Sequence, residues 1–160
     1  GVGKTTFAQA MHAYGLVVNN KTIQEYPFVT FNCADYFNNP QLLLSQLFGH
    51  VKNAFTGADH DKSGLVEQAD GGILFLDEVH RLPPDGQEML FYLMDKGEYN
   101  RLGDSNKRKS NILIIAATTE DPAAVLLNTF MRRVPVNIIL PNYKEKPMAE
   151  KIEIIDQFFR

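Results

Sequence analysis

The sequence has no tryptophan, only one cysteine and no long apolar run. A single cysteine, Cys33, cannot form an internal disulfide, so the fold depends on its hydrophobic core, and we expect Cys33 to pack as a small apolar residue. No stretch approaches the roughly 20 apolar residues that cross a bilayer, and no signal-peptide pattern opens the chain. These absences argue against a membrane protein and make the cytoplasm the expected location.

The chain also lacks an excess of basic charge. Its 16 Lys and Arg residues are outnumbered by 19 Asp and Glu residues, which gives a formal net charge of -3. A surface that grips the phosphate backbone of nucleic acids needs clustered Lys and Arg, so we expect any contact with DNA to come from a separate domain. With 160 residues, 44% of them hydrophobic, the chain suits one globular domain and leaves no room for a second complete one.

Apolar runs that suit strands alternate with segments of helical periodicity. Residues 73–76 form an uninterrupted apolar run, which is typical of a parallel strand buried on both faces, and residues 112–117 form a second strongly apolar run. Asn39 is placed to cap a helix, and Gly15 is placed to end one. We expect helices over residues 6–14, 40–48, 65–69, 84–97, 122–128 and 152–159, and strands over residues 28–31, 73–76, 98–102, 111–117 and 136–140. This alternation predicts an α/β fold with a mostly parallel central sheet flanked by helices.

The N-terminal residues supply the last five positions of the phosphate-loop pattern G-x-x-x-x-G-K-[ST]. Backbone N–H groups of such a loop, and the N-terminus of the helix that follows, favour phosphate oxygens. Lys4 adds a positive charge at the β- and γ-phosphates, and the Thr5 hydroxyl is suited to ligate Mg²⁺. We therefore expect ATP to bind residues Gly1, Val2, Gly3, Lys4, Thr5 and Thr6. The first residues of the pattern are absent from the sequence.

A second acidic motif completes the nucleotide-binding pattern. Asp77 and Glu78 follow the apolar run 73–76, at the strand end where open α/β sheets bind ligands. Asp77 would hold Mg²⁺ with Thr5, and Glu78 would orient and deprotonate the attacking water. A solvated acidic strand end is the alternative explanation.

Two further positions are candidates for a hydrolysis site. Thr119 follows the strand over 111–117 and would present a polar group to the γ-phosphate or to water, although strand-end threonines are also common without a function. Arg132 and Arg133 follow a helix and would face a neighbouring subunit, where an arginine stabilises the charge on the transferred phosphoryl group. A surface arginine pair is the alternative.

Residues 53–58, with the sequence Asn-Ala-Phe-Thr-Gly-Ala, resemble a family motif. They are similar to the GAFTGA loop of bacterial enhancer-binding proteins, the AAA+ activators of sigma-54 RNA polymerase, with Asn53 in place of the first glycine. Residues 47–50, 64–69 and 71–78 also resemble the corresponding segments of that family. The similarity extends over nearly the whole chain.

The resemblance implies an AAA+ P-loop NTPase that assembles into a ring, usually a hexamer, with ATP between the subunits. In such proteins the loop moves with the nucleotide state and contacts sigma-54, which assigns those contacts here to Phe55, Thr56 and Gly57. Asn32 matches the asparagine that restrains the catalytic glutamate in the family. The resemblance further implies an ATPase core over residues 1–143, truncated within the phosphate loop and lacking its first strand, and the start of a helical lid over residues 144–160.

Some positions depart from the family pattern. Thr119 stands where the family usually has asparagine. Arg133 matches one of the family's two arginine fingers best, and Arg132 would substitute for the other. These departures resemble the LevR-type branch, whose members control sugar phosphotransferase operons and carry additional regulatory domains. Proteins of the sugar phosphotransferase system are therefore expected partners of those other domains.

Two other functions remain open from the sequence. Residues 77–80 have the D-E-x-H form of a helicase, but a nucleic-acid-unwinding ATPase explains neither the loop over 53–58 nor the acidic balance. The basic residues 107–109 suit either a DNA contact or a solvated hairpin tip. A catalytically silent interaction module is disfavoured by the retained Lys4 and by the acidic pair. The four histidines are not at a zinc-binding spacing and are expected to be structural or surface residues; they are His12, His50, His60 and His80. Mg²⁺ is therefore the only metal expected.

Overall fold

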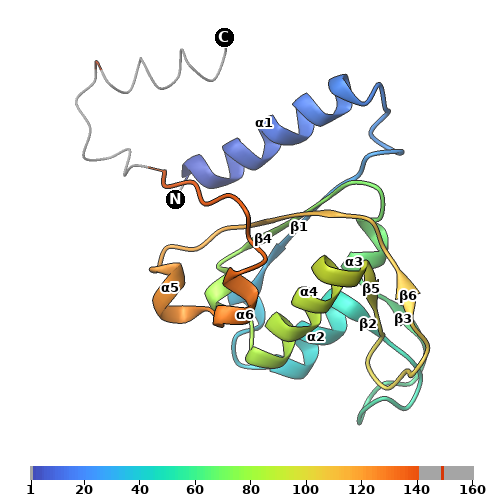
Figure 1. The fold of residues 1–160 in the computed structure, drawn as a ribbon. Coiled ribbons are helices and arrows are strands. Elements are labelled where there is room, and N and C mark those ends of the chain that lie inside the picture. The colour runs from blue at the N-terminus through green and yellow to red at the C-terminus, as the bar shows by residue number, and fades with distance from the viewer. Residues whose placement is uncertain (1, 141–148, 150–160) are drawn as a thin grey trace.

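A three-stranded parallel sheet organises the chain. The computed structural model describes residues 2–140 and 149. The strands are adjacent in the order β1, β4 and β7, and their bounds are Phe28–Asn32, Ile73–Asp77 and Leu113–Ala116. This arrangement confirms the predicted α/β class, because the three apolar runs of the sequence become neighbouring parallel strands (Figure 1).

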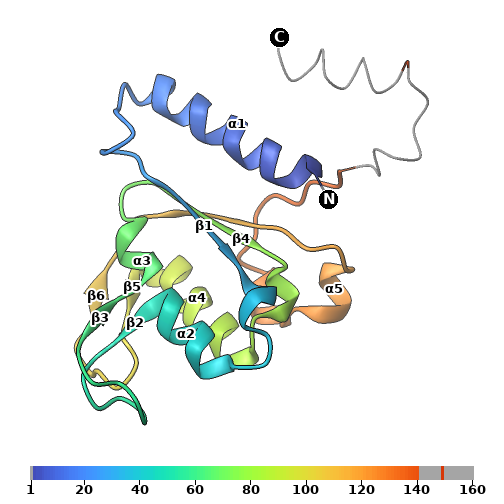
Figure 2. The ribbon, with the colours of Figure 1, turned by 180° about the vertical axis from the view of Figure 1, so that it is seen from behind.

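Helices cover both faces of the sheet. Helix α1 (Val2–Val18) lies over one face, and α2 (Pro40–Phe48) and α4 (Pro84–Lys96) lie over the other (Figures 1 and 2). Successive residues of β4 point to opposite faces, so Phe75 packs with Ala8 of α1, whereas Leu74 joins the main core. The remaining helices are short: η1 (Cys33–Tyr36), α3 (Leu65–Gln68), η2 (Val79–Arg81), α5 (Pro122–Val125) and α6 (Asn128–Met131).

The capping residues of α2 and α4 behave as their sequence predicts. Asn39 accepts a hydrogen bond from the backbone N–H of Leu42 at 3.1 Å, and Pro40 occupies the first turn of α2. Gly49 ends α2 and Gly97 ends α4, with positive φ angles of 78° and 66°. Both helices are therefore fixed in length by local chemistry.

The first helix is longer than predicted at both ends. It begins at Val2, so the lysine of the phosphate-loop pattern lies in its first turns, and it continues through Gly15. A Cβ at Gly15 would lie only 2.6 Å from Cε1 of Tyr26. His12 also reaches this tyrosine, because its Nε2 lies 2.7 Å from the Tyr26 carbonyl oxygen. Gly15 therefore permits close packing of α1 on the chain below it and does not end the helix.

The polar segment after α4 folds on itself and not along the sheet. Strand β5 (Glu98–Tyr99) pairs antiparallel with β6 (Arg108–Lys109), so the strand predicted over 98–102 is shorter than expected and its partner is β6 and not the strand expected over 111–117. The apolar residues of β7 pair with β4. Composition explains this separation, because β7 is apolar whereas β6 is basic; within the hairpin, Tyr99 of β5 packs in the main core.

The strand predicted for residues 136–140 is not formed. Val136, Ile138 and Ile139 are exposed by 66%, 51% and 88%, and no strand among the described residues pairs with them. An apolar, β-branched pattern requires a neighbouring strand to satisfy its backbone groups, and none of the described strands lies beside this segment. The predicted lid over 144–160 and its helix lie outside the described residues, Ala149 excepted. No helix in the described part is long and apolar enough to cross a membrane.

Candidate functional site

The carboxyl ends of the parallel strands bring the predicted site residues together. Asn32 and Asp77 are direct partners in the register of β1 and β4. The backbone N–H of Ala117, just after β7, donates to the carbonyl of Leu76, and its own carbonyl accepts from Val79 at 2.9 Å. The segments that carry Asp77 and Thr119 are therefore tied to one edge of the sheet, where open α/β folds bind ligands.

Glu78 lies at this edge in an uncommon backbone conformation. Its φ of 50° places it in the left-handed region, which non-glycine residues adopt mainly where the surroundings impose it. Its backbone N–H donates to Oδ1 of Asp77 at 2.9 Å. Oε1 of the Glu78 side chain lies 3.7 Å from Nζ of Lys4, and these side chains are 23% and 17% exposed. The two halves of the predicted nucleotide motif thus meet in space.

The second carboxylate oxygen of Glu78 has its own neighbours. The Thr119 hydroxyl donates to Oε2 at 3.2 Å, and Nε2 of His80 lies 3.4 Å from the same oxygen. The other ring nitrogen of His80, Nδ1, lies 2.8 Å from the Thr118 hydroxyl. Sequence reasoning missed His80, although the D-E-x-H pattern was visible, because only the turn of η2 directs the ring back toward the glutamate.

Asn32 makes a different contact from the one its family match implies. Its Oδ1 accepts a hydrogen bond from the backbone N–H of Ala34 at 3.0 Å and caps η1. Within the described part of the chain it has no hydrogen bond to Glu78. The neighbouring Cys33 is fully buried, and this burial, with the nearby Asp77 charge, raises the pKa of the thiol to about 12. Cys33 therefore stays protonated and packs in the core, as predicted.

The residues at this edge fit a magnesium nucleotide. The N-terminus of α1 has no acidic residue in its first turn, so the helix dipole and the Lys4 ammonium both favour an anion there. Thr5 and Asp77 offer a hydroxyl and a carboxylate. Mg²⁺ usually takes one or two protein oxygens and completes its shell with phosphates and water. The described residues contain no cluster of three or more His, Cys, Asp or Glu side chains suited to a metal. Gly1 and the Val2 side chain lie outside the described residues.

The two candidate arginines differ in their surroundings. Arg133 pairs with Asp95 through an Nη2–Oδ1 distance of 2.7 Å, and its guanidinium lies 5.2 Å from the ring centroid of Phe91. Arg132 is exposed, and its side chain has no partner in the described part of the chain. Helix α4 thus holds Arg133 and does not hold Arg132. Neither arginine contacts Glu78 within the described residues.

The segment over 53–58 forms the tip of a projecting loop. Strands β2 (Gly49–His50) and β3 (Lys62–Ser63) pair antiparallel at its base, and the loop extends from the body beside the β5–β6 hairpin (Figures 1 and 2). Thr56 and Gly57 are exposed. Phe55 is half-buried, with its ring centroid 5.0 Å from that of His50 in an edge-on contact.

Backbone conformation explains why asparagine replaces glycine at the start of this tip. Asn53 has a φ of 65°, and asparagine tolerates the left-handed region better than most residues. Its backbone N–H donates to the carbonyl of Ala58 at 2.8 Å, which closes the tip into a compact turn. The substitution therefore preserves the loop geometry.

The hairpin after α4 supports the loop. Leu102 donates to the carbonyl of Gly49 at 2.9 Å and accepts from the N–H of Val51 at 3.1 Å. Gly103, with a φ of 75°, lies so close to the loop that a Cβ would stand 2.7 Å from Cβ of Ala54. Loop and hairpin thus form one unit held by backbone hydrogen bonds and one close approach.

We expect Gly103→Ala to destabilise the fold by about 1–3 kcal/mol, because the new Cβ combines backbone strain with a steric clash. Gly57→Ala is the matched control, since Gly57 also has a positive φ of 92°, but a Cβ added there would meet no described atom within 4 Å. The free energy of unfolding in urea measures both. Equal losses would show that the contact with Ala54 contributes nothing.

The basic residues of the hairpin are compensated locally. The Lys107 ammonium donates to the Tyr92 hydroxyl at 2.8 Å and lies 3.5 Å from a carboxylate oxygen of Glu98. Arg108 lies 3.9 Å from a carboxylate oxygen of Asp104. These neighbours weaken the case for a DNA contact, because Lys107 and Arg108 already face tyrosine or carboxylate oxygens and only Lys109 of the three has no ion pair within the described part of the chain.

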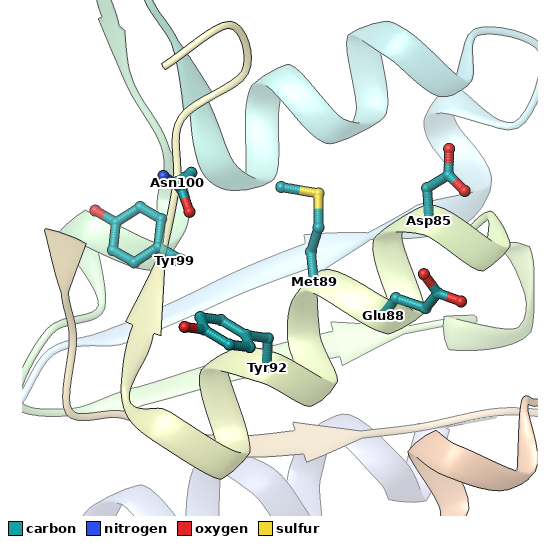
Figure 3. A pocket seen from close by; sticks show the side chains of 6 residues that line it. All are labelled: Asp85, Glu88, Met89, Tyr92, Tyr99 and Asn100. Atoms are coloured by element: carbon teal, nitrogen blue, oxygen red, sulfur yellow. The ribbon is translucent and has the colours of Figure 1, made fainter. Parts of the chain in front are cut away.

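A separate pocket lies between α4 and β5. Its volume is about 450 Å³, and it is lined by Asp85, Glu88, Met89, Tyr92, Tyr99 and Asn100 (Figure 3). None of the predicted site residues lines it. The carboxylates of Asp85 and Glu88 would repel phosphate, so this pocket does not suit the nucleotide.

Comparisons with known proteins agree with this geometry. The family described as "Sigma-54 interaction domain" matches residues 1–136. The transcriptional regulatory protein LevR of Bacillus subtilis (strain 168) is 57% identical over 155 residues, which cover 96% of this chain and 16% of LevR. DagR of Salmonella typhimurium (strain 14028s / SGSC 2262) is 52% identical over 161 residues, covering 100% of this chain and 17% of DagR. The chain spans about a sixth of the length of these relatives.

Solved structures of NtrX from Brucella abortus share the fold. One matches 99% of this chain and 35% of the NtrX chain with a TM-score of 0.73 and 27% identity. NtrX in complex with ATP matches 84% of this chain and 29% of its own, with a TM-score of 0.65 and 27% identity. From the family match, the relatives and the fold together, the chain belongs to the sigma-54 interaction domain family, the AAA+ ATPase domain of bacterial enhancer-binding transcription activators.

Proposed function

We propose that this domain binds ATP with Mg²⁺ at the carboxyl edge of its sheet, hydrolyses it, and uses the reaction to move the loop over 53–58 against sigma-54 in RNA polymerase. The approach of Lys4 to Glu78 at 3.7 Å carries the proposal, because it joins the phosphate-binding and acidic motifs in one place. The similarity to NtrX in complex with ATP and with ADP supports a nucleotide at this site.

Each side chain of the site has a chemical role in this proposal. Lys4 neutralises charge on the β- and γ-phosphates, and Thr5 and Asp77 hold Mg²⁺, which offsets further phosphate charge. Glu78 accepts a proton from water as the water oxygen bonds to the γ-phosphorus and the bond to the bridging oxygen breaks. Thr119 stabilises the orientation of Glu78 through its hydroxyl. Asn32 remains a candidate restraint that would act only after leaving its contact with Ala34.

The contacts with sigma-54 are proposed for Phe55, Thr56 and Gly57 at the loop tip. The exposure of Thr56 and Gly57 supports this role. Phe55 would have to leave its edge-on contact with His50 to contribute its whole ring. A cytoplasmic location is proposed with these contacts, because contact with RNA polymerase would require one. DNA binding, and responses to sugar phosphotransferase-system proteins, are assigned to other domains, and residues 144–160 to the start of the lid.

We further propose that copies of this chain form a ring, hexameric as in the resembling family, in which an arginine from one subunit reaches the nucleotide of the next. Arg132 is favoured as that arginine, because its exposed side chain has no partner among the described residues. Arg133 is already bound to Asp95 and packed on Phe91, so it would orient the end of α6 unless subunit contact releases it.

Mixing experiments test the ring and the arginine together. Arg132→Ala subunits bind ATP but lack the arginine, and Lys4→Ala subunits lack the site but retain the arginine. In an equal mixture about a quarter of the interfaces pair an intact site with an intact arginine, so we expect hydrolysis to recover to that extent. Activity is measured per subunit in chains that carry the whole phosphate loop. If hydrolysis recovers when Lys4→Ala subunits are mixed with Arg133→Ala subunits but not with Arg132→Ala subunits, the assignment is reversed. If it recovers in neither mixture, the result argues against an arginine acting between subunits.

A further inference from the structure

We propose that His80 is a positioning residue for Glu78. Together with Thr119 it holds Oε2 of the carboxylate, so that Oε1 faces the attacking water. This inference rests on the proposed function, because it takes Glu78 as the base that activates water.

The His80 ring is enclosed and directed at the glutamate. Its side chain is only 7% exposed, and Nε2 lies 3.4 Å from Oε2 of Glu78. The backbone of η2 fixes this approach, since Val79 donates to the carbonyl of Ala117 and Arg81 donates to that of Glu78. Few conformations remain open to a buried ring that is anchored on both sides.

The neighbours of the two ring nitrogens together indicate which nitrogen carries the proton. The Thr118 hydroxyl oxygen accepts from the backbone N–H of Glu120 at 3.0 Å and lies 2.8 Å from Nδ1 of His80. The hydroxyl can still donate or accept toward Nδ1, whereas an ionised Glu78 carboxylate can only accept. The tautomer with the proton on Nε2 is therefore the one that suits both neighbours, with Nδ1 accepting from the Thr118 hydroxyl. A neutral His80 therefore carries its proton on Nε2, the atom that faces Glu78.

The two oxygens of the glutamate consequently have different roles. Oε2 has two donors within reach, the Thr119 hydroxyl at 3.2 Å and Nε2 of His80 at 3.4 Å. Oε1 faces the Lys4 ammonium at 3.7 Å, and in the proposed function that ammonium turns to the phosphates when ATP binds. Oε1 is then left to accept the proton of water. Fixing one oxygen lowers the rotational freedom that the carboxylate must lose in the reaction.

His80 takes this position in the absence of the contact expected from Asn32. The Asn32 side-chain oxygen is engaged with the N–H of Ala34, and it makes no hydrogen bond to Glu78 among the described residues. The direct holders of the carboxylate in this chain are therefore His80 and Thr119, and Thr118 acts through His80.

Two amide substitutions separate positioning from packing. The side-chain nitrogen of glutamine reaches about as far as Nε2 of histidine, whereas that of asparagine reaches only about as far as Nδ1. We expect His80→Asn to lower kcat for ATP hydrolysis roughly 10- to 100-fold without changing KM, and His80→Gln to keep most of the activity. Thr118→Val, which removes the hydroxyl, should lower kcat in the same way, and Thr118→Ser, which keeps the hydroxyl, should have a kcat close to that of the wild type. All variants are compared in chains that carry the whole phosphate loop, with the unfolding temperature measured for each.

The double variant with Glu78→Gln makes the inference falsifiable independently of the proposed function. If His80 acts through the carboxylate, adding His80→Asn to Glu78→Gln causes no further loss of activity. A further loss of the same size, or equal activities of His80→Asn and His80→Gln, would overturn the positioning role. If Glu78→Gln alone hydrolysed ATP at the wild-type rate, Glu78 would not be the base of the proposed function.

Discussion

Replacing Glu78 with glutamine is expected to lower the rate of ATP hydrolysis by about 10² to 10⁴ while ATP binding is retained. Glutamine has nearly the shape of glutamate and tolerates the left-handed backbone conformation of position 78 about as well as glutamate does. The local structure at this edge of the sheet should therefore not change. The amide cannot accept a proton from water at neutral pH. The phosphate contacts proposed for Lys4 do not depend on the carboxylate, so the affinity for ATP is preserved.

Single-turnover hydrolysis and equilibrium binding of a fluorescent ATP analogue measure the two effects separately. Glu88→Gln is the control for the loss of one negative charge, because Glu88 is an exposed carboxylate of α4 that lines the separate pocket. It should hydrolyse ATP normally. Turnover by Glu78→Gln close to that of the wild type would assign water activation to another group.

The layered fold could be predicted because its signals are local. Residues 73–76 are apolar throughout, as a strand covered on both faces requires, and as β4 they lie beside the second apolar run, which forms β7 at the edge of the sheet. Asn39 and Gly97 act at helix ends through their own side chain or backbone, so their effect can be read without knowing the rest of the molecule.

The sequence-based predictions of secondary structure are wrong where the structure of a segment depends on a contact with another segment. Gly15 has the form of a helix stop, but it serves a close approach to Tyr26, eleven residues further along the chain and in another segment. Residues 136–140 have strand composition, but a strand forms only beside a partner, which the described residues do not supply. Local pattern cannot reveal either contact, because both depend on tertiary structure.

In the candidate site, too, features set by local motifs could be predicted and features set by tertiary contacts could not. The meeting of Lys4 and Glu78 follows from motifs whose chemistry requires it, so sequence alone was enough. The position of His80 depends on the turn of η2 and on a threonine 38 residues away, and a lone histidine carries no signal of its own. The preference for Arg132 over Arg133 likewise rests on Asp95, which belongs to a different helix.

The contacts of α4 suggest how the site and the proposed subunit boundary would communicate. The helix begins just after η2, and its Gln87 side chain donates to the carbonyl of Leu82 and accepts from the N–H of Leu127. Asp95, near the other end of the helix, holds Arg133. Helix α4 therefore contacts both ends of α6, and in the proposed ring a shift of the acidic motif would be transmitted along it to the segment that carries Arg132 and Arg133.

Replacing Thr56 with alanine is expected to abolish capture of sigma-54 while leaving ATP hydrolysis largely intact. Thr56 is exposed at the loop tip, and its hydroxyl has no partner in the described part of the chain, so the substitution removes no internal contact. The loop tip is closed by backbone hydrogen bonds of Asn53 and Ala58, which alanine at position 56 does not disturb. The loss should therefore fall on the interface alone, where a central contact is worth about 2 kcal/mol or more, a weakening of roughly 30-fold or greater.

Binding of purified sigma-54 is measured with a transition-state mimic of ATP hydrolysis bound to the chain, and hydrolysis is measured in parallel. Thr56→Ser is the matched control, because it keeps the hydroxyl and loses only a methyl group; it should bind more tightly than Thr56→Ala. If serine and alanine weaken binding equally, the methyl group and not the hydroxyl makes the contact. Undiminished binding by Thr56→Ala would show that the projecting loop serves another purpose, since the exposed residues of its tip are the part best placed to touch a partner.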